Sequence, residues 1–115
     1  MSALLYLTQG PTKIVTAGSR QLIQNALDVT EYRHLALLLE VLAFVGTDYE
    51  IVVMTGMQLD TEDGWIELGT FGTRTLEDSF PLNLSDALRS IRWEVKGLTG
   101  STPHVTFVIS GVGRS

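Results

Sequence analysis

The stretch TEDGWIELGTF, residues 61–71, carries the side chains best suited to chemistry. With the preceding Asp60, the residues Glu62 and Asp63 make a cluster of carboxylates, and calcium binds several such oxygens from a short flexible loop. Calcium loops, however, space their ligands over about a dozen residues and end in a bidentate glutamate, and this spacing is missing here. Asp63-Gly64 is a common hairpin signal, because both residue types tolerate positive φ where a chain reverses. We therefore predict a solvated turn and no metal site.

Trp65 directly follows this turn and has two interpretations. It could be a stacking platform for a sugar ring, with Asp63 and Glu67 accepting hydrogen bonds from sugar hydroxyls. It could equally close one end of a hydrophobic core. Asp63 and Trp65 are accordingly the candidate ligand-binding residues, while Trp93 belongs to an alternating apolar set and is predicted to lie in the core.

Catalytic patterns are missing from the chain. His34 and His104 are the two histidines, lie far apart in the sequence and have no neighbouring carboxylate pair, as a catalytic dyad or a zinc site would need. The sequence contains neither a nucleophile elbow nor a phosphate-binding glycine loop. We predict a protein that is not an enzyme and uses no cofactor.

Composition limits the remaining classes. A chain of 115 residues fits one domain. The net charge is −5, its eight basic residues are scattered, and this disfavours direct nucleic-acid binding. With no cysteine, the fold depends on packing alone. The N-terminal MSALLYLTQGPTK has no basic leader and is interrupted by Gly10-Pro11, so we expect neither a signal peptide nor a membrane span, and a soluble protein.

Period-two patterns indicate strands. In RSIRWEVKG, residues 89–97, Ile91, Trp93 and Val95 alternate with Arg92, Glu94 and Lys96, which predicts one dry and one wet face. HVTFVIS, residues 104–110, alternates in the same way and begins after a proline, so these two segments are expected to form an antiparallel pair.

The middle of the chain gives further strands. EIVVMTGMQL and WIELGTF, residues 50–59 and 65–71, flank the Asp63-Gly64 turn and are expected to form a hairpin. In the next stretch, Thr73, Thr75 and Phe80 suit an exposed strand, while Pro81 and Asn83 suit a loop.

The stretch EYRHLALLLEVLAFVG, residues 31–46, is ambiguous. Leu35, Leu38, Leu39 and Leu42 form a helical stripe, yet Leu35, Leu37, Leu39 and Val41 also alternate. Its neighbours favour a strand, because short strands separated by Gly and Asp turns are typical of a sandwich or barrel. Residues 1–24 differ in character and are expected to be an N-terminal arm or edge strand, ahead of a domain at 25–115.

Three segments carry a resemblance to a known group: ALDVTEYRHLALLLEVLAFVGT, DGWIELGTF and LRSIRWEVKGLTGSTPHVTFVISGVG. Together they resemble small tailed-bacteriophage proteins that are encoded among the virion structural genes, over roughly residues 26–113. The matching positions are Tyr32, Arg33, Leu35, Asp63, Gly64, Trp65, Leu68, Gly69, Phe71, Arg89, Arg92, Trp93, Val95, Phe107, Ser110 and Gly111. The spacer expected between Asp-Gly and the following Trp is missing, which shortens the turn.

This resemblance implies an all-β, antiparallel, jelly-roll-like β-sandwich with an N-terminal extended arm, and it favours a strand over RHLALLLEV. It also implies a non-enzymatic virion protein, of the capsid decoration or minor head type, that contacts the major capsid protein. A homo-oligomer is expected, with a symmetric trimer as one arrangement.

The expected contact segment is the arm, through Leu4, Leu5, Tyr6 and Leu7, because extended segments add readily to sheet edges. A tail or neck component is an alternative within the same class. A carbohydrate-binding sandwich module, using Trp65 and Tyr49, is the alternative from another class.

Overall fold

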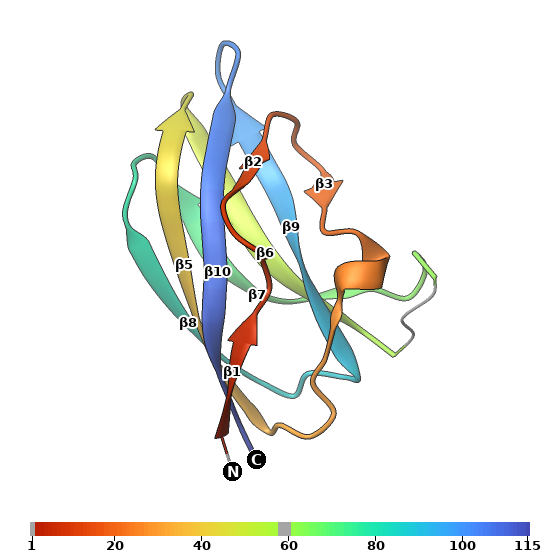
Figure 1. Cartoon of the computed structure of the whole chain (residues 1–115). Coiled ribbons are helices and arrows are strands. Elements are labelled where there is room, and N and C mark those ends of the chain that lie inside the picture. Colours follow the sequence, from red (N-terminus) through yellow and green to blue (C-terminus); the bar gives the residue numbers. More distant parts are fainter. Residues whose placement is uncertain (1, 58–60) are drawn as a thin grey trace.

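A computed structural model describes residues 2–57 and 61–115, and almost all of its regular structure is β-strand. Figure 1 shows the strands along the chain, with a single turn of 3₁₀ helix between the early ones. The elements are β1 (Ser2–Tyr6), β2 (Thr12–Ile14), β3 (Ser19–Arg20), η1 (Ile23–Asn25), β4 (Leu27–Asp28), β5 (His34–Val45), β6 (Asp48–Gly56), β7 (Ile66–Arg74), β8 (Ser79–Ser85), β9 (Ser90–Thr99) and β10 (His104–Arg114). Across the described residues, no helix is long and apolar enough to cross a membrane.

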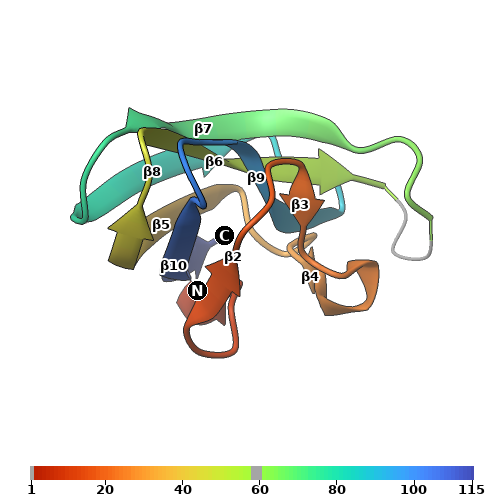
Figure 2. The ribbon, with the colours of Figure 1, turned by 90° about the horizontal axis from the view of Figure 1, so that it is seen from above.

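The strands form two antiparallel sheets that pack face to face, as the view from above shows (Figure 2). Sheet A has the order β1-β10-β5-β8, with β2 also on β10, and sheet B has the order β3-β9-β6-β7, with β4 also on β9. If β1 with β2 and β3 with β4 each count as one interrupted strand, this is the order of an eight-stranded jelly roll. The predicted all-β sandwich is confirmed.

The core lies between the sheets and follows the strand period. Leu35, Leu37, Leu39 and Val41 of β5 are all buried, so the ambiguous stretch is a strand, as its alternation indicated. Across the core, the Trp93 ring on β9 meets the Phe107 ring on β10 edge to face, with centroids 5.1 Å apart. The prediction that Trp93 lies in the core is confirmed.

The expected pairing of residues 89–97 with 104–110 is wrong. β9 belongs to sheet B and β10 to sheet A, and they face each other across the core. The physical reason is that both sides of each strand are already occupied. β9 has β6 on one side and β3 and β4 on the other, while β10 has β5 on one side and β1 and β2 on the other. Neither strand has a free edge at which the other could pair, and their apolar faces meet across the core.

The expected loop at Pro81 and Asn83 is also wrong, because both residues lie within β8. β8 is an edge strand of sheet A and pairs with β5, with Pro81 opposite Leu38. An edge strand needs ladder hydrogen bonds on one side only, and a proline without an N–H is therefore tolerated there.

Residues 1–24, expected as an arm or edge strand, supply edge strands to both sheets. β1 pairs with β10 over its whole length, β2 pairs with β10, and β3 pairs with β9. Gln21 anchors the end of this segment, because its side chain donates to the carbonyls of Leu7 and Asn25 and accepts from the N–H of Trp93.

Candidate partner-binding surface

The N-terminal residues expected to bind a partner separate into two groups in β1 and just after it. Leu5 and Leu7 point inward and are buried in the core, whereas Leu4 and Tyr6 are 71% and 59% exposed. Alternate residues of a strand project to opposite faces of a sheet. Leu4 and Tyr6 therefore lie on the outer face of sheet A, and these two side chains are available to a partner.

Leu4 and Tyr6 continue into two rows that cross all four main strands of sheet A. The first row pairs Leu4 with Val112, Ala36 and Asn83, and the second pairs Tyr6 with Ser110, Leu38 and Pro81. Most of these side chains are apolar, and together they line a shallow hollow of about 410 Å³. We call the eight residues of the two rows the A-face.

Sequence reasoning named Leu4 and Tyr6 as candidates and did not name the other members of the A-face. A signal was present in β5, where Ala36, Leu38 and Leu42 are apolar on the side away from the core. A strand that is apolar on both faces while one face looks outward indicates a surface that another body covers. The signal was missed because Leu38 and Leu42 also belong to the helical stripe.

Trp65 is 8% exposed and does not present an open stacking face. Its ring lies under the Arg92 guanidinium, 4.5 Å from the ring centroid, and packs with Val52 and Met54. The indole N–H donates to the carbonyl of Thr61 at 2.8 Å. Trp65 therefore closes a small second apolar cluster on the outer face of sheet B, and Glu67, expected beside a sugar, bonds to Lys96 instead.

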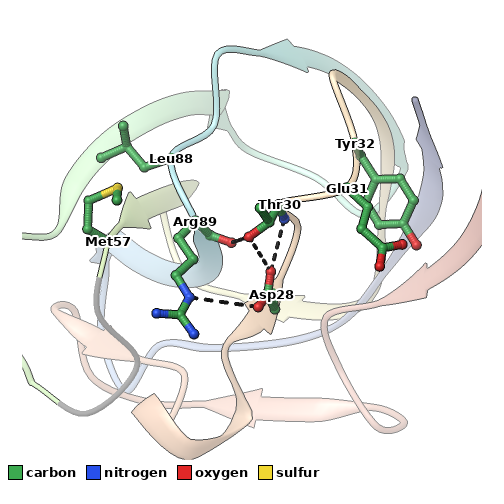
Figure 3. A pocket seen from close by; sticks show the side chains of 7 residues that line it. All are labelled: Asp28, Thr30, Glu31, Tyr32, Met57, Leu88 and Arg89. Carbon is green, nitrogen blue, oxygen red and sulfur yellow. Dashed lines mark hydrogen bonds and ion pairs between the residues drawn. The ribbon is translucent and has the colours of Figure 1, made fainter.

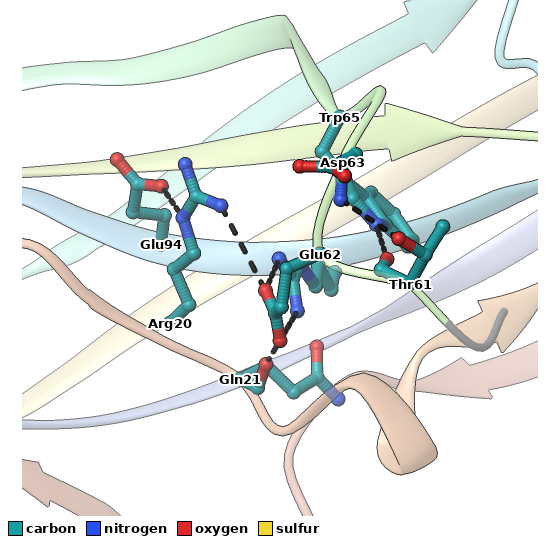
Figure 4. Close-up of polar contacts among 8 residues, drawn as sticks. Arg20, Gln21, Thr61, Glu62, Asp63, Trp65 and Glu94 are labelled. Atoms are coloured by element: carbon teal, nitrogen blue, oxygen red, sulfur yellow. Dashed lines mark hydrogen bonds and ion pairs between the residues drawn. The ribbon is translucent and has the colours of Figure 1, made fainter. Parts of the chain in front are cut away.

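Arg92 is buried, with 1% exposure, and the prediction that it faces water is wrong. Figure 4 shows how the turn at residues 61–65 and the segment around Gln21 cover this part of β9. The guanidinium donates to both carboxylate oxygens of Glu62, at 3.2 and 2.5 Å, and to the carbonyl of Gln21 at 3.3 Å. Because these groups close over the strand, a position that alternates outward is removed from solvent.

The acidic turn is thus part of a charge network. Glu62 pairs with Arg92 and lies 3.9 Å from Arg20, which in turn bonds to Glu94 (Figure 4). The hydrogen bond from Arg92 lowers the pKa of the Glu62 carboxyl below its ordinary value. Among the described residues, no group of three or more candidate ligands could hold a metal ion. Asp60, the other acidic residue of the expected cluster, lies outside the described residues.

A second hollow, of about 890 Å³, opens at one end of the sandwich (Figure 3). Asp28 accepts hydrogen bonds from the hydroxyl and N–H of Thr30 and lies 3.8 Å from the Arg89 guanidinium. The side-chain hydrogen bond from Thr30 is the largest cause of the lowered pKa of Asp28. Within the hollow, Asp28, Thr30 and Arg89 therefore satisfy one another.

The two histidines lie apart, as the sequence suggested. His34 is the first residue of β5 and His104 the first residue of β10. These starts lie at opposite ends of the antiparallel β5–β10 ladder, where His34 pairs with Arg114 and His104 with Val45. The fold therefore does not bring the two imidazoles together into one site.

Comparisons with known proteins concern the fold. No protein-family model matches the chain, and no curated protein matches it at a significant level. Among solved structures, the chain is similar to the crystal structure of the SPBc2 prophage-derived protein YomS, with a TM-score of 0.53 and 14% sequence identity. The match covers 98% of this chain and 94% of that chain. The whole jelly roll, including the N-terminal strands, therefore has a counterpart in a solved structure.

Proposed function

We propose that this chain is a non-enzymatic structural protein of a bacteriophage particle, of the capsid decoration or minor head type, and that it attaches through the A-face. Its mechanism is adhesion: burial of apolar side chains against a neighbouring virion protein, such as the major capsid protein, provides the free energy.

The observation that carries this proposal is the apolar character of the A-face. The inner faces of both sheets already enclose a continuous core, so the fold itself does not require leucine, valine and tyrosine on the outside of sheet A. An antiparallel sheet with one face in water normally alternates apolar and polar residues. The largest contiguous apolar patch on the surface of a soluble protein is often a functional contact site.

The similarity to a prophage-derived protein supports the particle assignment. It extends over nearly the whole of both chains, and jelly rolls are a frequent architecture of viral capsid proteins. The fold alone leaves many functions open, and the proposal therefore depends on the A-face together with this similarity.

Leu4 and Tyr6 contribute to the proposed contact, while Leu5 and Leu7 support the fold beneath it. Deletion of residues 1–24 would remove core side chains and edge strands together, so it would confound attachment with unfolding. Substitution of exposed side chains separates the two effects.

The test is the copy number of this chain in purified particles from its source, measured by mass spectrometry relative to the major capsid protein. Near-stoichiometric abundance is the expected result, and a few copies per particle would assign the chain to the neck or tail instead. Absence from particles would overturn the proposal.

Two variants connect the copy number to the surface. Tyr6→Glu places a charge on the A-face and is expected to lower incorporation strongly. Thr73→Arg, at an exposed position of β7 opposite Glu50 in sheet B, also introduces a charge; it is the control and should be incorporated like the unaltered protein. Equal incorporation of both variants would exclude the A-face as the attachment surface.

A further inference from the structure

The A-face has the form of a trough that runs along the strands. Leu4 and Tyr6 on β1 form one wall, and Pro81 and Asn83 on β8 form the other. The floor comes from β10 and β5, where Ser110 and Ala36 are small and Val112 and Leu38 are partly buried. Small residues on a floor allow a partner's backbone to approach closely.

The width of the trough fits one α-helix. Its walls stand on strands separated by three strand spacings, which corresponds to about 14 Å. An α-helix with its side chains has a diameter of about 10–12 Å. The polar side chains of His34 and Glu40 bound the trough along β5, and these two residues are about 20 Å apart along the strand. A helix of roughly 13 residues has this length.

The trough does not fit a second copy of itself. Two copies that met through this surface would bring two hollows of about 410 Å³ face to face and leave both unfilled, whereas protein interfaces are closely packed. A short element that fills the trough instead buries its apolar side on both walls and the floor, which uses the available surface more fully.

Strand addition is disfavoured at both edges of sheet A. On one edge, β8 contains Pro81, which has no N–H to donate. On the other edge, β1 and β2 are short and are separated by the Gly10-Pro11 break. A partner that docks on sheet A is therefore directed to its outer face.

The charges at the two ends of the trough give the helix a direction. Glu40 lies in the row beyond Leu38, while His34 and Arg114 share the row beyond Ala36. A helix has partial positive charge at its N-terminus and partial negative charge at its C-terminus. The complementary orientation places the helix N-terminus at Glu40 and its C-terminus at Arg114.

We infer that the partner of the A-face is a single amphipathic α-helix of about three to four turns, which lies in the trough antiparallel to β5. This deepens the proposed function and rests on it for the use of the A-face. The helix presents apolar residues at positions i, i+3, i+4 and i+7, and it belongs to another virion protein.

The experiment uses the full chain and model peptides of about 18 residues. One peptide carries leucine at helical spacing among equal numbers of glutamate and lysine, and a second peptide of the same composition alternates leucine with polar residues, which favours a strand. Backbone amide chemical shifts of the protein are followed by NMR during titration. The variants are Ala36→Arg, which fills the floor, and Thr73→Arg as the control on sheet B.

The expected result is that the helical peptide shifts Ala36, Leu38, Ser110 and Val112, and that Ala36→Arg weakens its affinity at least about tenfold. Thr73→Arg should leave the affinity unchanged. A spin label at the peptide N-terminus should broaden Glu40 more than Arg114.

Three results would overturn the inference: equal binding of the alternating peptide, shifts outside the A-face, or no shifts with either peptide. Sedimentation equilibrium adds a fourth, since a dimer that Ala36→Arg abolishes would assign the A-face to a second copy. Particle incorporation is measured separately, so a protein that is incorporated but does not bind the helical peptide would refute the helix and leave the proposed function intact.

Discussion

Tyr49 links the core to the segment between β7 and β8. We predict that Tyr49→Phe changes the free energy of unfolding in opposite directions near neutral pH and at high pH. The side chain is fully buried on β6. Its hydroxyl donates a hydrogen bond of 2.6 Å to the carbonyl of Leu76, and its ring meets the Phe44 ring edge to face at 4.6 Å. Tyr49→Phe removes the hydroxyl and keeps the ring.

At pH 8 the variant should be less stable. It loses one hydrogen bond and leaves the carbonyl of Leu76 without this donor, which costs about 1–2 kcal/mol in the free energy of unfolding. The ring contacts do not change, so the effect measures the hydroxyl alone.

At high pH the sign reverses. Burial raises the pKa of Tyr49 from its ordinary value of 10.0 to about 12, and the carboxylates of Asp78 and Glu77 add to the increase against the opposing effect of Arg74. The folded state therefore holds this proton after the unfolded state has lost it. As pH rises from 10 to 12, the unfolded state binds fewer protons and the free energy of unfolding falls. A shift of this size corresponds to about 2 kcal/mol lost by pH 12.

The variant cannot lose this contribution, because it has no phenol to titrate. Tyr49→Phe should therefore be about 1–2 kcal/mol less stable than the unaltered protein at pH 8 and equally stable or more stable at pH 12. Urea unfolding followed by circular dichroism at a series of pH values measures the difference. Tyr6→Phe, at an exposed tyrosine, is the control and should follow the unaltered protein. A difference for Tyr49→Phe that stays constant from pH 8 to 12 would refute the argument.

Three further predictions concern other parts of the fold. Glu62→Gln should lower the thermal midpoint at pH 7, whereas Asp63→Asn should not. Because the pKa of Glu62 is lowered in the folded state, the stabilisation by this carboxylate should be fully present above the ordinary carboxyl pKa and should be lost as pH falls through the pKa of the folded state. Thermal unfolding at a series of acidic pH values measures this loss. Gly111→Ala should lower the free energy of unfolding in urea by about 1–3 kcal/mol, because the added Cβ would lie 2.3 Å from the carbonyl oxygen of Ala36. Gly97→Ala is the control, since the Cβ added there meets only ordinary van der Waals contacts. Leu39→Ala should lower the free energy of unfolding by about 2–5 kcal/mol, since this core side chain is fully buried, and calorimetry checks this value.

The strands themselves could be predicted from the sequence where alternation is strong. Ile91, Trp93 and Val95 of β9 are all buried, as their period indicated. The same rule identified the inward leucines of β5 once its neighbours favoured a strand over a helix. Local patterns suffice for these features because the side-chain period of a strand is set by its backbone geometry.

The partners of those strands could not be predicted from the sequence. Antiparallel pairing within one sheet and packing across two sheets place the same apolar residues in contact, so the alternation of β9 and β10 is compatible with both. The strands that flank them decide between the two arrangements, since β6 with β3 and β4 pairs with β9, and β5 with β1 and β2 pairs with β10. Pro81 was assigned to a loop for a related reason, since only the edge position of β8 makes a proline acceptable there.

The candidate surface divides in the same way. The sequence by itself determined an all-β chain with an apolar extended segment near its N-terminus, and this placed Leu4 and Tyr6 among the candidates together with Leu5 and Leu7, which are buried. Only the tertiary structure decided that Ala36, Leu38, Pro81 and Val112 lie beside them, because their contacts depend on strand register between segments far apart in the chain. It also decided that Arg92 and Trp65 are covered, because the segments that cover them come from the 61–65 turn and the Gln21 region. Burial of a strand's outer face depends on what packs over it, and its own period carries no information about that cover.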